Sequence, residues 1–492
     1  MATRTIANGG GNWNAVGTWV ENAVPTSADD VVATGTSGQL TLNAAAACRS
    51  FDMTGYTNTL THNTGITLTI GDGTAGAGNV ALKLVAGMTY TPASARAITF
   101  ASTSATQQTV TCGGKTLGAA TFSGSGGSWK FNDAFACGAL TQNAANTLDT
   151  NNQSASCTSY TGSSTGTLTL GSSAVACTGN WTVVAGQTLT ANTATITFSG
   201  GTFSGGGKTY GTVVMTKNGA VTLADSNTFA TLTRTGGASA GTNTLVLPAA
   251  SSNQTIGTLN INGNSAGNRV FVQGADALGA TRSTLTVSTA FNGSNADFQA
   301  VAFAGAASGD ISGWSGGAGD ALNNTGLTFT SAATSYWVGN GGNWSDAANH
   351  WASTSGGTPG TGRVPLPQDS VVFDASSFSS TGQTSTCDLR LNSRSIAMTS
   401  VANAPTISFA GTSGILSVTL LKGGGVAGSL VVLSGIATIN CQLGSAIPVN
   451  LNYTSISNLT VTQGDAYAAN SLGLGTNVGI KFQSPPSYVS AF

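Results

Sequence analysis

Side chains that could act as acids or bases are scarce in this chain. Of its 492 residues, 7% are charged, one is a glutamate and two are histidines, His62 and His350. Histidine is the usual general base near neutral pH. His62 lies among threonine and asparagine residues, and His350 stands where a related stretch of the chain has Thr18. Because a catalytic base would not be replaced by threonine in the second copy of its motif, both histidines are interpreted as surface or cap residues.

Hydrolysis of glycosidic bonds would need two carboxylates about 5–10 Å apart. The densest acidic positions are Asp29-Asp30, Asp369 and Asp374. Asp29, Asp30 and Asp369 begin a strand that occurs twice in the chain, so turn and strand-edge roles explain them better than catalysis. The sequence therefore predicts a protein without catalytic residues. It leaves open a pair of aspartates on neighbouring elements.

Two kinds of glycine-rich stretch are candidates for phosphate or calcium binding. Gly114-Lys115-Thr116 and Gly207-Lys208-Thr209 contain the end of a phosphate-binding loop, which also needs a glycine five residues before the Gly-Lys pair. Those positions hold Thr109 and Thr202, so the glycines are interpreted as turns. Residues 316–320 approach a calcium-binding nonapeptide repeat, but they are one residue short and unrepeated. We expect no cofactor and no metal site.

The seven cysteines form no Cys-x-x-Cys pair, and their odd number argues against a complete disulfide framework. Cys137, Cys157 and Cys177 lie 20 residues apart among small residues. Such a period fits one coil of a β-solenoid, in which equivalent positions stack about 4.8 Å apart. Because free cysteine behaves as a small buried hydrophobe, we predict that these thiols form an internal ladder. Metal binding by this column is unsupported, since no histidine or carboxylate shares its period.

A tryptophan-containing stretch occurs twice in the chain. Its first copy is Gly11-Asn12-Trp13, Trp19, Pro25 and Asp29-Asp30-Val31-Val32, and its second is Gly342-Asn343-Trp344, Trp351, Pro367 and Asp369-Ser370-Val371-Val372. The tryptophans could offer a stacking platform for sugars, or they could plug the open end of a β-structure. Stacked repeats need terminal caps, and the pair heads each segment. Trp13, Trp19, Trp344 and Trp351 are therefore predicted to be structural caps.

The elements that would position these residues are short strands. Thr67-Leu68-Thr69-Ile70 and Thr284-Leu285-Thr286-Val287 alternate threonine with aliphatic residues, as in strands with one buried face. Little glutamate or lysine is present to cover helix surfaces, and 68 glycines supply turns. We predict an all-β fold of β-solenoid (parallel β-helix-like) or elongated β-sandwich units in tandem, each headed by a tryptophan cap module. The expected divisions are an N-terminal cap (1–60), a β-repeat body (61–304), an irregular linker (305–335), a second cap (336–410) and a C-terminal β-region (411–492).

Charge and hydropathy exclude several kinds of partner. A net charge of −1 gives no electrostatic basis for binding nucleic acid or an anionic membrane surface. No apolar run reaches the roughly eighteen residues that a spanning helix needs. Residues 1–5 lack the apolar core of a signal peptide. We therefore expect a protein made in a cytoplasm, with no nucleic acid as partner and no membrane insertion.

The order Gly-Asn-Trp, Trp, Pro, Asp-x-Val-Val resembles the segment that heads β-rich repeats in tailed-phage virion structural proteins. It is also similar to segments of autotransporter-like bacterial surface proteins. The resemblance to phage proteins implies a non-enzymatic part of the virion exterior, such as a tail fibre, a spike or a head or neck decoration. It further implies self-association, commonly as a homotrimer, together with contacts to other virion proteins and to a host surface glycan.

Three other functions stay open. A bacterial surface adhesin would share the fold and lie on the bacterial cell surface, but it would normally carry an export signal. A tailspike depolymerase would use an aspartate pair in a groove. An ice-binding surface would need Thr-x-Thr elements at a strict coil period, which the spacing of these elements along the sequence does not show.

Overall fold

The computed structural model of the protein describes residues 1–162, 165–238, 243–248, 252–274, 281–390, 392–409, 415–436, 438–441, 449–462 and 465–482. Strands account for 48% of the chain and helices for 2%, so the prediction of an all-β fold is confirmed. The strand pairs of the described residues are parallel, apart from one short antiparallel pair described below. Long sheets of parallel strands are typical of a β-solenoid.

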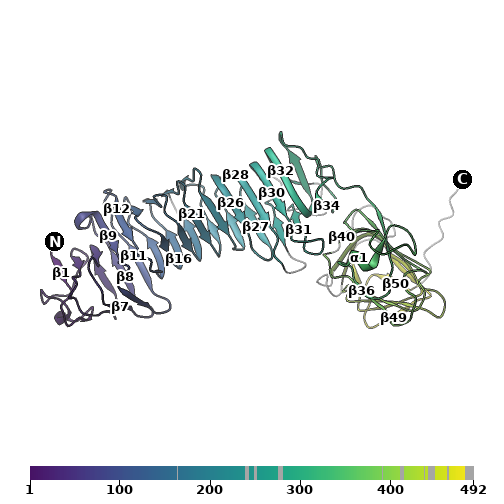
Figure 1. Ribbon diagram of the computed structural model, residues 1–492, viewed down its shortest axis with the longest axis horizontal. Helices are drawn as coiled ribbons and strands as arrows, with labels where there is room; N and C mark the ends of the chain where they lie inside the picture. The colour runs from purple at the N-terminus through teal and green to yellow at the C-terminus, as the bar shows by residue number, and fades with distance from the viewer. Residues whose placement is uncertain are drawn as a thin grey trace. The chain divides into compact units, whose positions relative to one another are not determined.

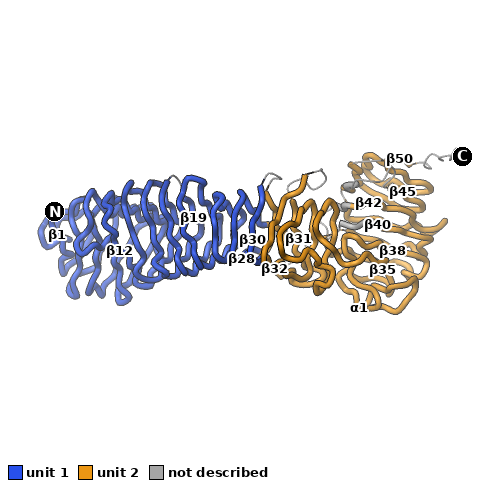
Figure 2. Tube along the Cα trace, turned by 90° about the horizontal axis from the view of Figure 1, so that it is seen from above, with its two compact units in different colours: residues 1–217, 221–233, 252–258 blue, residues 218–220, 234–251, 259–492 orange. Residues whose placement is uncertain are grey.

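The chain divides into two compact units, coloured blue and orange in Figure 2. Unit 1 consists of Met1–Lys217, Val221–Thr233 and Ser252–Thr258, and unit 2 consists of Asn218–Ala220, Arg234–Ser251 and Leu259–Phe492. Two strands, β28 (Thr228–Thr235) and β30 (Asn253–Asn262), have residues in both units.

In unit 1 the chain winds into coils whose strands stack into parallel sheets (Figure 1). One sheet contains β1 (Thr3–Thr5), β3 (Asp30–Val32), β6 (Ser50–Asp52), β9 (Val80–Lys83), β12 (Gln108–Thr111), β14 (Ser128–Phe131), β17 (Thr147–Asp149), β20 (Thr167–Thr169) and β23 (Thr188–Thr190). A second contains β2 (Gly11–Asn12), β4 (Leu40–Leu42), β7 (Thr59–His62) and β10 (Thr89–Pro92).

The remaining strands of unit 1 form two further parallel rows. One row is β5 (Ala46–Cys48), β8 (Thr67–Ile70), β11 (Ala97–Phe100), β13 (Ala119–Phe122), β16 (Ala139–Gln142), β19 (Ser159–Gly162), β22 (Trp181–Thr182), β25 (Thr202–Ser204) and β27 (Val221–Ala224). The other row is β15 (Phe135–Ala136), β18 (Ala155–Cys157), β21 (Ala174–Cys177), β24 (Thr195–Phe198) and β26 (Thr209–Met215). Two short 3-10 helices, Val16–Thr18 and Ala77–Asn79, lie in the connections.

Alternation along each strand decides which side chains enter the core. In β8, Leu68 and Ile70 are buried, whereas the threonines beside them are partly exposed. Equivalent positions of successive coils then stack on one another. The rings of Phe100 and Phe122, which are register partners, lie 4.5 Å apart and nearly parallel. The core of unit 1 is therefore built from columns of like residues.

Unit 2 begins with strands that pair in parallel around the long strand β32. These strands are β29 (Thr244–Val246), β31 (Val270–Gln273), β32 (Ser283–Gln299), β33 (Val301–Ala304) and β34 (Ser315–Asp320). β32 pairs with β31, β33 and β34. Residues 305–335, which were expected to form an irregular linker, thus contain β34. We call β29 and β31–β34 the first stack of unit 2.

The rest of unit 2 is a second stack of coils with two parallel sheets. One sheet contains β35 (Thr334–Trp337), β38 (Ser370–Asp374), β40 (Asn392–Thr399), β42 (Ile415–Gly424), β45 (Val449–Asn452), β48 (Ala466–Ala469) and β50 (Ile480–Lys481), with β37 (Trp351–Ala352), β44 (Thr438–Cys441) and β47 (Thr460–Val461). The other contains β36 (Gly342–Asn343), β39 (Thr384–Thr386), β41 (Thr406–Ser408), β43 (Val431–Ser434), β46 (Thr454–Ser457) and β49 (Leu472–Leu474). One helical turn, α1 (Ala347–His350), precedes β37. In the part of the chain that the structure describes, no helix has the length and apolar character to span a membrane.

Candidate functional site

The first tryptophan module is organised around the carboxylate of Asp29. It accepts hydrogen bonds from the backbone N–H groups of Ala2 (3.2 Å) and Thr26 (3.0 Å), and Arg4 donates to it from Nε at 3.4 Å. Burial raises the pKa of Asp29, but these hydrogen bonds outweigh burial and hold the pKa below its ordinary value. Asp29 therefore works as an anchor that ties the chain's first residues to the turn before β3.

The second module repeats this arrangement with Asp369. Its carboxylate accepts hydrogen bonds from the backbone N–H groups of Ala333 and Leu366, both at 2.8 Å. Arg363 donates to both oxygens, from Nε at 2.9 Å and from a terminal nitrogen at 2.6 Å. In both copies the backbone N–H three residues before the aspartate donates to it, so Thr26 corresponds to Leu366 in the folded chain. Pro25 therefore corresponds to Pro365 and not to Pro367, with which the order of the motif had aligned it.

The neighbouring residue differs between the modules. Asp30 is bound by the guanidinium of Arg49 and by the hydroxyl of Ser50 at 2.6 Å. Burial raises the pKa of Asp30, but the hydrogen bonds from Arg49 and Ser50 lower it by more than burial raises it. The pKa of Asp30 therefore lies below its ordinary value. In the second module, Ser370 stands in this place and bonds the hydroxyl of Ser395 at 3.0 Å. An aspartate replaced by serine is compatible with a structural role and not with a shared catalytic one.

The four tryptophans form two closely similar pairs. Trp13 and Trp19 meet edge to face with ring centres 5.1 Å apart, and Trp344 and Trp351 do so at 5.3 Å. In each pair the second indole N–H donates to the backbone carbonyl of the first tryptophan, at 3.0 Å and 2.7 Å. All four side chains are at most 2% exposed. Their faces are covered by protein, so no surface is left on which a sugar could stack.

The second tryptophan of each pair lies at the outer edge of a parallel sheet. Trp19 bridges Ile6 in antiparallel fashion, immediately after β1. Trp351, in β37, pairs antiparallel with Trp337, in β35. A short antiparallel segment on the first strand blocks continuation of the parallel sheet on that side. We call this side of each stack its head, and the opposite side its tail.

The two histidines have structural surroundings. His62 is wholly buried rather than on the surface: its Nε2 donates to the carbonyl of Ile66 (2.9 Å), and its Nδ1 accepts from the Tyr90 hydroxyl (3.0 Å). Burial lowers the pKa of His62, which favours this neutral form. His350 stacks on Trp337, with ring centres 4.7 Å apart, and its Nδ1 lies 3.2 Å from the carbonyl of Val338. His350 therefore belongs to the second cap.

The cysteines of the 20-residue period share one column. Ala136 pairs with Ser156 and Ser156 with Ala176, so the residues that follow them, Cys137, Cys157 and Cys177, stand above one another on successive coils. All three are buried and have free thiols. Burial raises the pKa of Cys137, and a hydrogen bond with Cys177 together with burial raises that of Cys157. In the described residues, no group of three or more histidine, cysteine, aspartate or glutamate side chains could hold a metal ion.

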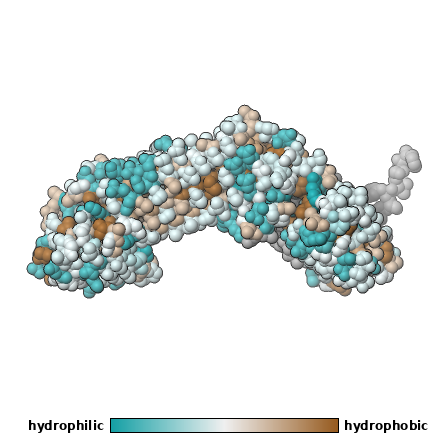
Figure 3. All heavy atoms as spheres, in the orientation of Figure 1, coloured by the Kyte–Doolittle hydropathy of each residue, from teal (hydrophilic) through white to brown (hydrophobic). Residues whose placement is uncertain are grey.

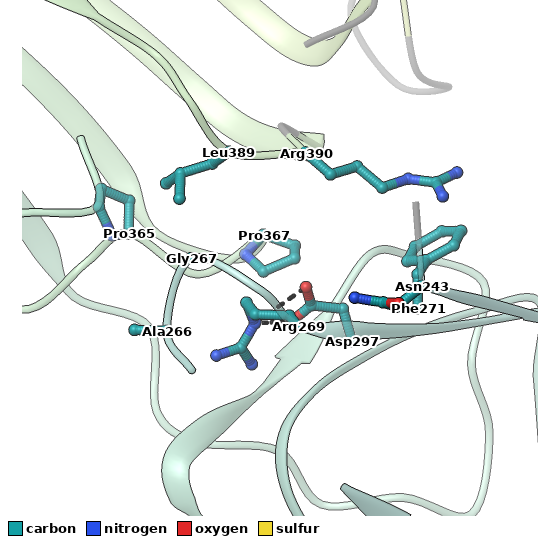
Figure 4. A pocket seen from close by; sticks show the side chains of 10 residues that line it. All are labelled: Asn243, Ala266, Gly267, Arg269, Phe271, Asp297, Pro365, Pro367, Leu389 and Arg390. Atoms are coloured by element: carbon teal, nitrogen blue, oxygen red, sulfur yellow. Dashed lines mark hydrogen bonds and ion pairs between the residues drawn. The ribbon is translucent and has the colours of Figure 1, made fainter. Parts of the chain in front are cut away.

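A polar cluster in unit 2 surrounds the small cavity drawn in Figure 4. Arg269 donates from Nε to both oxygens of Asp297, at 2.8 and 3.0 Å. The guanidinium of Arg390 lies 3.8 Å from the ring centre of Phe271 and donates to the hydroxyl of Thr244 at 2.8 Å. The cavity measures about 20 Å³. That volume holds about one water molecule, so the cluster is a packed contact rather than a ligand pocket.

Sequence reasoning missed this cluster entirely. Arg269, Asp297 and Arg390 come from distant parts of the sequence and belong to no motif. Burial raises the pKa of Asp297, and Arg269 opposes that rise. A buried carboxylate between arginines is a feature of enzyme sites, but here both oxygens are already bound by Arg269, and the cavity admits no substrate. The arrangement holds two segments of unit 2 together.

The geometry thus shows structural contacts for Asp29, Asp30, Asp297 and Asp369 and for the two histidines. No protein-family model matches the chain, and neither curated proteins nor solved structures gave a match.

Proposed function

We propose that this chain is a non-enzymatic structural component of the exterior of a phage virion, a tail fibre, spike or head or neck decoration. The observation that carries the proposal is the use of the buried carboxylates. Asp29, Asp30, Asp297 and Asp369 are each bound by an arginine within the fold. An arginine beside a carboxylate favours its ionised form, whereas a general acid must hold a proton.

The surface supports a role in permanent assembly. With 7% charged residues, it offers little electrostatic steering, so specific contacts must come from shape and hydrogen bonds over large areas. On the face shown in Figure 3 most atoms are of intermediate hydropathy, and strongly hydrophilic atoms occur in scattered patches. Repetition of one subunit multiplies modest contacts. The proposed partners are further copies of the chain, as a homotrimer, other virion proteins, and a host surface glycan.

The enzymatic alternative can be tested directly. Purified protein is incubated with host cells and with the polysaccharide of the host surface, and the length of the polysaccharide is followed by size-exclusion chromatography. We expect an unchanged length distribution, with heat-unfolded protein as the control. Shortening of the polysaccharide by the folded protein alone would overturn the proposal in favour of a tailspike depolymerase.

A further inference from the structure

One sheet of unit 1 ends after four strands, although the coils continue. In this 4-stranded sheet, β2–β4–β7–β10, the last strand is β10, and within the described residues it pairs with β7 alone. Thr89, Thr91 and Pro92 are exposed, whereas Tyr90 is partly buried. An edge strand with so few buried side chains is among the parts of a fold that open most easily. The attachment of β10 therefore depends on the side chain of Tyr90 and on the backbone hydrogen bonds to β7.

The hydroxyl of Tyr90 is bound by a buried histidine. His62, the last residue of β7, is 0% exposed. Its Nε2 lies 2.9 Å from the carbonyl oxygen of Ile66, which can only accept, so this nitrogen carries the proton of the neutral ring. Its Nδ1 then accepts from the Tyr90 hydroxyl at 3.0 Å. The backbone N–H of Ala93, directly after β10, donates to the carbonyl of His62 at 2.9 Å. His62 thus holds β10 by two hydrogen bonds, and the one to Tyr90 requires an unprotonated Nδ1.

Arg96 brings a positive charge next to this pair. Its guanidinium carbon lies 5.9 Å from the centre of the Tyr90 ring, and its terminal nitrogens donate to two backbone carbonyls. The register partners of His62 on β4 and β10, Leu42 and Pro92, are uncharged. In the described part of the chain, neither Arg96 nor His62 forms an ion pair with a carboxylate.

The other titratable groups beside the pair supply it with no negative charge. Burial raises the pKa of the Tyr90 hydroxyl and raises that of the Cys112 thiol to about 12, so both are neutral near pH 7. The carboxylate of Asp133, beside Cys112, accepts hydrogen bonds from the backbone N–H groups of Cys112 and Gly113, both at 2.7 Å. A positive charge on His62 would therefore be buried without a carboxylate in contact.

Protonation of His62 would break its contact with Tyr90. The protonated ring donates from both nitrogens, so the Tyr90 hydroxyl would lose its acceptor, and a second cation would be buried beside Arg96. Burial lowers the pKa of His62 and Arg96 adds to this shift, although the Ile66 carbonyl opposes it. Once β10 has opened, the ring meets water and regains the ordinary pKa of about 6.5. The free energy that holds β10 closed is therefore complete above about pH 6.5 and is lost as the pH falls toward the lower pKa of the folded chain.

We propose that the contact between His62 and Tyr90 is a pH-sensitive switch: in mild acid His62 takes up a proton and β10 separates from β7, while the rest of unit 1 stays folded. The opening is local because β7 keeps its other partner, β4, and unit 1 contains no second histidine. Separation leaves N–H and C=O groups of β7 without partners on one side, which is a sheet edge able to pair with a further strand. The inference concerns unit 1 alone and does not depend on a role in a virion.

Hydrogen exchange followed by mass spectrometry measures the opening in the full chain. The protein is labelled at about pH 7.5 and about pH 5.5, on either side of the ordinary histidine pKa, with labelling times scaled for the pH dependence of intrinsic exchange. Because the open form has a pKa of about 6.5, the opening constant of β10 should rise by up to about tenfold at the lower pH. Peptides that contain residues 89–93 report this rise. Peptides over β14 are the reference and should keep their protection.

Two variants separate the histidines. His62→Gln removes the titrating ring, so β10 should exchange alike at both pH values, whereas His350→Gln, at the chain's other histidine, should respond as wild type does. Nuclear magnetic resonance of labelled histidine in His350→Gln follows His62 alone and decides the question if His62→Gln does not fold, because its proton uptake should coincide with the opening of β10. Unchanged exchange of β10 in wild type overturns the proposal. So does an equal loss of protection in β14, or a pH response that persists in His62→Gln.

Discussion

Several buried polar side chains of this protein are paired across coils. The network in unit 1 shows the principle: the amide of Gln187 donates to Gln142 at 2.7 Å, and the Tyr160 hydroxyl donates to the same oxygen at 3.1 Å. A buried polar group without a partner costs free energy, so each partner depends on the others. Replacing a single residue of a cap should therefore lower the stability of the fold strongly. Under the proposed non-enzymatic role, such a replacement should change no catalytic activity.

The tryptophan caps give the first prediction. Replacing Trp19 by alanine removes a buried indole and its hydrogen bond to Trp13, so the free energy of unfolding should fall by about 3–5 kcal/mol. Val20→Ala is the control, since Val20 is 59% exposed and should change stability by less than about 0.5 kcal/mol. Urea unfolding followed by far-ultraviolet circular dichroism measures both. Unchanged unfolding of Trp19→Ala with loss of glycan binding would instead make the pair a ligand platform.

The carboxylates of the first module predict that the stability of the protein depends on pH in the acid range. Because the pKa values of Asp29 and Asp30 are lowered in the folded chain, their stabilisation is present above the unfolded pKa of about 3.9 and is lost as the pH falls through the folded pKa. Resistance to urea should therefore fall below about pH 5. Asp30→Asn should be less stable at neutral pH and show a shallower decline. Subtracting the stability of Asp30→Asn from that of wild type at each pH removes the contribution of the other carboxylates. Equal slopes of stability against pH in the two proteins would contradict the assignment.

The cysteine column predicts that thiols stay unreactive until the chain unfolds. The thiolate is the reactive form, and burial raises the pKa of Cys137, as it raises that of Cys112 outside the column to about 12. The hydrogen bond with Cys157 lowers the pKa of Cys177, but this thiol is 1% exposed and out of reach of a reagent. With Cys441 replaced by serine, a thiol-specific disulfide reagent at neutral pH should label the protein only in denaturing urea. Thr188→Cys supplies an exposed control that should react at once. Rapid labelling of Cys157 in folded protein would show that the column is open to solvent.

At the scale of elements, the sequence predicted the strands and the coil period where coils have equal length. It did not predict the register of the whole stack. Thr99, Thr121, Thr141, Thr161 and Thr182 stand in one column, although the spacing between them varies along the sequence. Turns of different length absorb the variation, and only backbone pairing reveals the alignment. The spacing of these threonines along the sequence is not strict, yet their register in the stack is.

The column does not by itself make an ice-binding surface. In the strands of Thr99 and Thr121 the outward position two residues earlier is alanine, Ala97 and Ala119. A double row of threonines appears in β20 and β23, where Thr167 pairs with Thr188 and Thr169 with Thr190.

The arginine partners of the aspartates could not be predicted from the sequence either, because an ion pair between coils leaves no short motif.

The register predicts that a complete coil can be removed. Thr167 pairs with Thr188, Ala174 with Thr195 and Trp181 with Phe203, so deleting residues 167–187 brings equivalent positions of the next coil into place. The shortened chain should fold, with strand content unchanged in circular dichroism. Deleting residues 167–177 is the matched control, since it shifts the sheets against one another and should give insoluble protein. Equal behaviour of the two deletions would contradict the coil assignment.

At the scale of the whole molecule, the duplicated modules were visible in the sequence, but their docking was not. Gln368 recognises backbone carbonyls of Ala318 and Thr330, which any sequence could supply. The proposed role on a virion depends on assembly, because a structural protein acts through the positions and contacts of its copies.

Immunogold labelling of purified virions tests that role most directly. Antibodies raised against the folded protein are applied to intact particles and viewed by electron microscopy, with antibodies adsorbed on the protein as the control. The account predicts gold at a fixed position on the particle exterior, on the tail or at the head or neck. Particles that stay unlabelled, while gold decorates the envelope of the bacterial cell, would contradict it and favour a surface adhesin.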